Sequence, residues 1–144
     1  MVTAARIAET LGGARALKFK HVTLEDLRVR VRTGLPYSAL EAVASGFEIG
    51  TADLVAVLRV PARTLARRKR EKRLRADESD RLFRLSRIAT LAEEVLGSRE
   101  KATRWLHQAN RALGNATPLR HIDTELGARQ VEALLLRIAH GVYS

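Results

Sequence analysis

Apolar residues recur along this chain at the spacing of amphipathic helices. Residues 4–11 follow the i, i+3, i+4, i+7 pattern, which stops at Gly12 and Gly13. The same pattern, with turn residues at its ends, predicts further short helices over residues 23–34, 37–45 and 52–58, and from residue 62 onward. The front part of the chain is therefore predicted to be a compact bundle of about five short helices.

The segment 23–34 allows two interpretations. Apolar residues alternate with arginines over residues 27–31, which also fits a strand. However, Thr23 with Asp26 three residues later resembles a capping box, and Gly34 is followed by a Leu-Pro pair that would end a helix. We therefore predict a helix here.

The second half is predicted to be helical as well. From residue 77 to 96, apolar residues recur at alternating spacings of three and four and form a seam on one side of the helix, which must pack against another apolar surface. The seam is made of Leu82, Leu85, Ala89, Ala92 and Leu96. The sequence does not decide whether this seam packs within the chain or across a dimer. Gly97 ends this helix, Ser98 caps the next, Thr117 with Pro118 begins a short one, and a last helix runs from about Ala128. The whole pattern predicts an all-α fold.

The most basic segment lies directly behind a short apolar helix. Residues 59–75 hold nine Lys or Arg and one acid. Such a run is also typical of a solvated helix face or a linker. Here, however, an apolar helix ends at Leu58, Pro61 suits the first turn of a new helix, and Leu65 is the one position within the run that looks buried. We therefore predict a helix, a tight turn and a DNA-recognition helix in a Cro/C1-like bundle.

The first turn of a recognition helix faces base edges, where Arg can bind guanine through two hydrogen bonds and Thr can contact a phosphate or the thymine methyl group. The candidate DNA-binding residues are Arg63, Thr64, Arg67 and Arg68, and Arg70 is suited to a phosphate or to solvent. Because one short helix reads few bases, we expect a homodimer on a palindromic operator, paired through the N-terminal domain.

Charge divides the chain into two parts. The net charge is +10, of which residues 1–75 carry 16 basic and 7 acidic groups, and residues 76–144 carry 10 and 9. This asymmetry predicts a polyanion-binding domain over residues 1–75 and a domain with another task over residues 76–144. No apolar run is long enough to span a membrane, and the N-terminal residues lack the apolar stretch of a signal peptide. We expect a cytoplasmic protein without membrane contact.

Several kinds of chemistry have no support in the sequence. There is no Cys, and the four His lack the i, i+3 or i, i+4 spacing of a helical metal site. No phosphate-binding Gly-rich loop or nucleophile elbow is present. Adjacent acids such as Glu93 and Glu94 would point about 100 degrees apart on a helix. We therefore expect no enzyme, no metal and no cofactor.

The last forty residues resemble a known family. The segment from Thr103 to Ser144, TRWLHQANRALGNATPLRHIDTELGARQVEALLLRIAHGVYS, is similar to the C-terminal toxin-binding domain of the Xre/MbcA/ParS antitoxins. Residues 64–68 and 78–82 are similar too, so the resemblance covers roughly residues 35–144. Ala109 departs from the usual Pro of the family, and Asn115 from a frequent second Gly. With the helix-turn-helix, the chain resembles the Xre antitoxins of RES-Xre toxin-antitoxin pairs.

The resemblance implies two binding tasks. The C-terminal domain would neutralise a cognate NAD-degrading RES toxin, with the end of the chain in the toxin's active site, and the helix-turn-helix would repress the operon. The candidate toxin-binding residues are Trp105, Asn110, Arg137, Gly141, Val142, Tyr143 and Ser144. Trp105 is also explained as a core residue, Asn110 as a capping residue, and the last three as a frayed end. Two alternatives stay open: a stand-alone transcription regulator, and an antitoxin to another toxin class.

Overall fold

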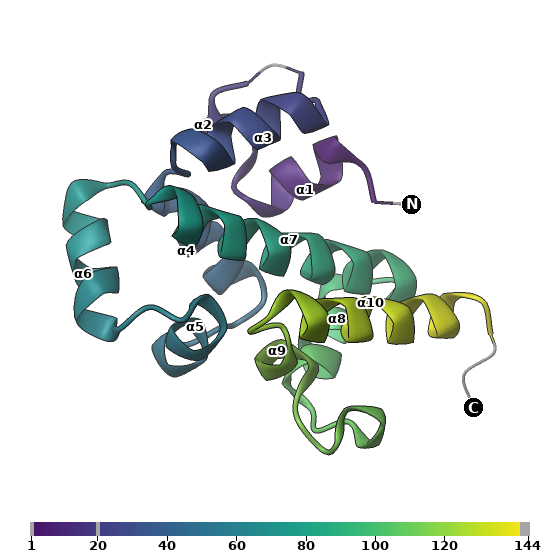
Figure 1. The fold of residues 1–144 in the computed structure, drawn as a ribbon. Helices are drawn as coiled ribbons and strands as arrows, with labels where there is room; N and C mark the ends of the chain where they lie inside the picture. Colours follow the sequence, from purple (N-terminus) through teal and green to yellow (C-terminus); the bar gives the residue numbers. More distant parts are fainter. Residues whose placement is uncertain (1, 20, 142–144) are drawn as a thin grey trace.

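The computed structural model describes residues 2–19 and 21–141. The described residues form ten α-helices and one 3₁₀ helix without any strand, which confirms the all-α fold. None of the described helices is both long and apolar enough to cross a bilayer. In chain order (Figure 1) the helices are α1 Ala4–Thr10, α2 Gly13–Leu17, α3 Leu24–Thr33, α4 Tyr37–Gly46, α5 Thr51–Leu58, α6 Ala62–Glu71, α7 Ala76–Leu96, α8 Arg99–His107, η1 Arg111–Leu113, α9 Pro118–His121 and α10 Glu125–Ala139.

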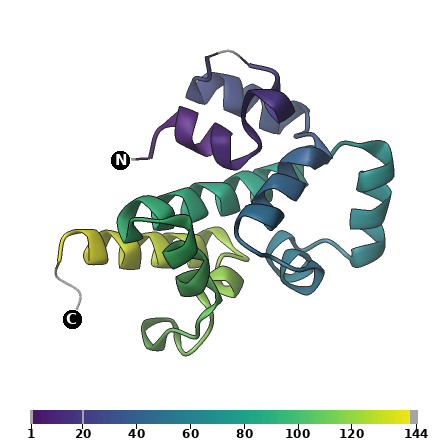
Figure 2. The same cartoon turned by 180° about the vertical axis from the view of Figure 1, so that it is seen from behind.

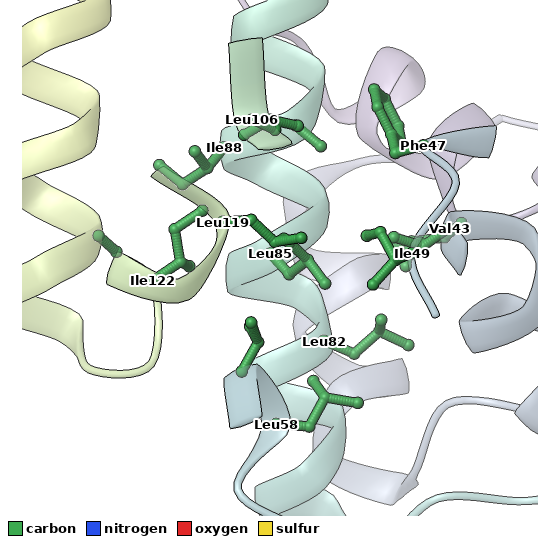
Figure 3. Packing of buried hydrophobic residues seen from close by; sticks show 14 of the residues in the cluster. Val43, Phe47, Ile49, Leu58, Leu82, Leu85, Ile88, Leu106, Leu119 and Ile122 are labelled. Atoms are coloured by element: carbon green, nitrogen blue, oxygen red, sulfur yellow. The ribbon is translucent and has the colours of Figure 1, made fainter. Parts of the chain in front are cut away.

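Helix α7 crosses the middle of the molecule and joins its two parts. Helices α1 to α3 lie along one side of α7 and helices α8 to α10 along the other, as the opposite views agree (Figures 1 and 2). The predicted seam packs within the chain, because Leu82, Leu85, Ala89 and Ala92 are completely buried there. Around Leu85, side chains from α4, α5 and α9 converge (Figure 3). Both parts therefore share one hydrophobic core.

Local signals explain most helix ends. The Thr23 hydroxyl accepts a hydrogen bond from the Asp26 N–H, and the Asp26 carboxylate accepts one from the Thr23 N–H. This capping box and the stop at Gly34 confirm a helix, and not a strand, over this segment. At Gly34 the backbone has a φ of +109° and lies against the Leu74 carbonyl, so a side chain would clash there.

Three features differ from the predictions. Helix α1 ends before Gly12, as predicted, but Gly12 adopts the left-handed conformation and Gly13 begins a short helix, α2, that was not predicted. Helix α5 begins at Thr51, one residue before the predicted start, with Gly50 as its N-cap. Helix α10 begins at Glu125, earlier than expected, because Thr124 caps it by accepting the Gly127 N–H.

Gly127 lets α10 approach α9 closely. A Cβ atom at this position would collide with the backbone carbonyl of His121. We therefore expect Gly127→Ala to lower the free energy of unfolding by about 3 kcal/mol, because a backbone carbonyl cannot move aside as a flexible side chain can. Urea unfolding would measure the loss. Gly50→Ala is the control, since nothing lies within 4 Å of its Cβ position. Because Gly50 is an N-cap, where Gly is preferred to Ala, it should cost about 1 kcal/mol. Equal losses would contradict this account of the α9 and α10 contact.

Candidate functional site

Helices α5 and α6 form the predicted helix-turn-helix. Leu54, Val57 and Leu58 bury one face of α5, and the turn begins at Arg59, whose left-handed backbone has a φ of +56°. Val60 is buried in the turn before α6 begins. Helix α6 stands at one edge of the molecule (Figure 1), and of its ten residues only Leu65 and Arg68 are buried. Its outer surface is therefore accessible to a large partner.

One side of α6 carries most of its accessible charge. Arg63, Arg67 and Arg70 are exposed, and their spacing of four and three residues places them on one side of the helix, which we call the basic face. Buried Leu65 lies on the opposite side, and Thr64 is half-buried beside the basic face. None of the three arginines of the basic face forms an ion pair with another described residue. Their charges are thus available for phosphates or base edges.

The structure corrects the prediction for Arg68. Its guanidinium is buried, and its Nε and Nη2 donate hydrogen bonds of 2.7 and 2.9 Å to the two carboxylate oxygens of Glu78 on α7. The Glu78 carboxylate also accepts the Arg75 N–H. Burial alone would raise the pKa of Glu78, but the bonds from Arg68 and Arg75 outweigh it and hold this pKa below its usual value. Arg68 therefore serves the fold and does not reach DNA in this conformation.

The C-terminal part carries a shallow hollow. The α9–α10 hollow has a volume of about 410 Å³ and is lined by Ala112, Leu113, Gly114, His121, Gln130, Ala133 and Arg137. A hydrogen bond joins His121 Nε2 to Gln130 Oε1 on one side of it. Arg137 is exposed at its rim and has no ion pair with a described residue. The hollow thus presents one accessible cation among small and polar side chains.

The other toxin-binding candidates lie apart from one another. Asn110 precedes the loop that lines the hollow, and its side chain caps η1 by accepting the Ala112 N–H, as the capping interpretation predicts. Trp105 is partly buried against the core and does not line the hollow. Gly141 is exposed with a φ of +68°. Val142, Tyr143 and Ser144 lie outside the described residues. Of these candidates, only Arg137 and the loop that follows Asn110 come together, at the α9–α10 hollow.

Polar contacts between the two parts were missed by the sequence interpretation. Arg120 on α9 forms an ion pair with Asp53 on α5. From α7, Arg81 donates a hydrogen bond to the Leu58 carbonyl and Arg84 one to the Asp123 carbonyl. These partners lie 23 to 67 residues apart in sequence, so no local spacing reveals them. They tie the helix-turn-helix to the C-terminal helices.

Two family models match consecutive segments of this chain. Residues 26–87 match the family model of the antitoxin Xre-like helix-turn-helix domain, and residues 91–141 match that of the antitoxin Xre/MbcA/ParS C-terminal toxin-binding domain. An Antitoxin Xre of Photorhabdus laumondii is 31% identical over 132 residues, which cover 90% of this chain and 89% of that protein. The chain belongs to the Xre antitoxin family.

Two further Xre antitoxins are similar. That of Pseudomonas putida is 45% identical over 83 residues, which cover 57% of this chain and about half, 52%, of that protein. That of Yersinia enterocolitica is 28% identical over 116 residues, covering 79% of this chain and 78% of that protein. In this chain the first family model ends and the second begins inside α7, between residues 87 and 91. The division at residue 75 stays a prediction, since α7 packs on both parts.

Proposed function

We propose that this protein is the antitoxin of a type II toxin-antitoxin system that inhibits a cognate NAD-degrading RES toxin and represses its own operon. Membership of the Xre antitoxin family supports the two binding tasks. The observation that carries the DNA-binding task is the basic face of α6, whose three arginines are exposed and form no ion pair with any residue that the structure describes. The RES class of the toxin rests on the sequence resemblance.

The basic face suits the major groove of DNA. An α-helix fits this groove, where exposed arginines bind guanine edges or phosphates, and Thr64 at the margin of the face suits a phosphate contact. A single helix of ten residues reads only a few base pairs. We therefore propose that a homodimer binds a palindromic operator upstream of its own gene and so represses transcription.

Binding to this operator should depend on salt. With Arg63 and Arg67 at base edges, the Arg70 side chain of each copy remains for a phosphate, so the slope of log affinity against log salt should be about −2 or steeper. Fluorescence anisotropy with a labelled fragment from upstream of the gene, at several salt concentrations, would measure the slope. A slope near zero, or the absence of a footprint at moderate salt, would contradict the proposed operator contact.

The toxin-binding task is proposed for the C-terminal domain. The α9–α10 hollow, with Arg137 at its rim and the loop after Asn110 on its wall, supports a contact surface in which the cation meets an acidic group of the toxin. We propose that most of the buried contact area comes from these helices. The terminal residues Val142, Tyr143 and Ser144, named by the resemblance, would enter the active site of the toxin and block it.

A further inference from the structure

Helix α6 is attached to the protein at few points. Of its ten residues only Leu65 and Arg68 are buried, and they lie three residues apart on the side opposite the basic face. After the helix, the chain is fixed by backbone hydrogen bonds, from the Leu74 N–H to the Leu35 carbonyl and from the Tyr37 N–H to the Lys72 carbonyl. One apolar side chain and two ends leave the rotation of α6 about its own axis weakly defined.

The ion pair between Arg68 and Glu78 supplies the missing constraint. Its two parallel hydrogen bonds, of 2.7 and 2.9 Å, join a planar guanidinium to a planar carboxylate, and such a two-point contact fixes orientation as well as distance. Glu78 is itself fixed, because it accepts the Arg75 N–H at 2.9 Å in the first turn of the long helix α7. The side of α6 opposite the basic face is therefore attached to the most extensively packed helix of the molecule.

We infer that the Arg68–Glu78 pair positions the recognition helix, so that the basic face meets the operator in one defined rotation. The inference rests on the proposed DNA-binding function and adds two positioning residues to it. Neither residue touches DNA. Sequence-specific contacts require the arginines to match base edges within a narrow geometry, whereas non-specific binding needs only their charge near the phosphates. Loss of the pair should therefore reduce discrimination between sequences more than it reduces affinity for DNA in general.

Glu78→Gln tests the inference with little change of shape, because Gln can still accept the Arg75 N–H but no longer pairs its charge with Arg68. Glu71→Gln is a matched control: Glu71 also contacts Arg68, at 3.2 Å, but its side chain is 54% exposed. Both variants remove one negative charge within reach of the same guanidinium. A difference between them therefore reports the buried two-point contact and not the net charge.

The measurement compares affinity for the operator with affinity for a scrambled fragment of equal length, at one salt concentration. For Glu78→Gln we expect the ratio of the two affinities to fall at least about tenfold, while binding to the scrambled fragment stays within about twofold. Glu71→Gln should keep the ratio of the wild type. Equal ratios for Glu78→Gln and the wild type would overturn the inference. A wild type that does not distinguish the two fragments would instead contradict the proposed function.

A second variant covers the case in which Glu78→Gln does not fold, as judged by circular dichroism and thermal unfolding. Arg68→Lys keeps the buried positive charge but replaces the planar fork with a single ammonium group. It should lose the operator preference in the same way while its helical content stays that of the wild type. Full operator preference in a folded Arg68→Lys variant would also overturn the inference, because only the two-point geometry has been removed.

Discussion

Replacing Arg63 and Arg67 together with Ala is expected to weaken operator binding by about three orders of magnitude. Both side chains are exposed on the basic face and have no ion-pair partner among the described residues. A two-point contact between Arg and a guanine is worth about 1–3 kcal/mol. The dimer would lose four of them, so even at about 1 kcal/mol each the cost should be about 4 kcal/mol, or about 1000-fold in affinity. The fold should persist, because neither side chain packs in the core.

The matched control for this variant is Arg104→Ala with Arg129→Ala. Both side chains are exposed, at 63% and 72%, and they lie on helices α8 and α10, away from α6. The change in net charge is the same for both double variants. Anisotropy titrations with the operator fragment should therefore show the large loss only for the Arg63 and Arg67 pair. A similar loss in the control would mean that overall charge, and not the basic face, carries the binding.

Removing Val142, Tyr143 and Ser144 is expected to release the RES toxin from inhibition while the complex still forms. An anchoring aromatic residue at the centre of an interface typically contributes about 2–4 kcal/mol, which corresponds to about 30- to 1000-fold in affinity. The truncated chain keeps the buried residues of α10, such as Val131, Leu134 and Leu135, so its fold should be unchanged. The loss of inhibition can exceed the loss of affinity, because the tail inhibits by filling the active site of the toxin, and without it the site is open even when the complex forms.

The truncation is measured by NAD consumption of the toxin, titrated with the full-length chain and with a chain ending at Gly141. A pull-down with the same two chains reports the complex separately. Tyr143→Ala is an intermediate variant, which should weaken inhibition without removing the terminal carboxylate. Equal inhibition by all three chains would contradict the plug, and would leave blockade by the helical body around Trp105 and Arg137 as the mechanism.

Local sequence signals predicted the helices well, because caps and periodicity act over a few residues. The Thr23 cap, the Gly97 stop and the Ser98 cap are found where they were expected. The start of α10 was placed too late, since Gly127 was not recognised as a point of close contact with α9. This contact depends on α9, and the spacing of apolar residues within α10 does not show which segment lies against it.

The burial of Arg68 could have been anticipated only in part. Its spacing of three from Leu65 places both residues on the inner side of α6, and this signal is present in the sequence. Charged residues are rarely buried unless they are paired, so the run of basic residues favoured an outward side chain. The partner Glu78 lies on the next helix, and its approach depends on the turn after α6. The packing of α7 against both the N-terminal and the C-terminal helices was likewise not predictable from the spacing of apolar residues alone.

The central claim is that one fold with a shared hydrophobic core holds two independent binding surfaces, the basic face for DNA and the C-terminal domain for the proposed RES toxin. The most direct test is to titrate the NAD consumption of the proposed RES toxin with the wild type and with the variant lacking Arg63 and Arg67. We predict that both chains stop NAD consumption at the same molar ratio, although only the wild type binds the operator. A toxin that stays active with the wild type, or escapes inhibition by the variant alone, would contradict the claim.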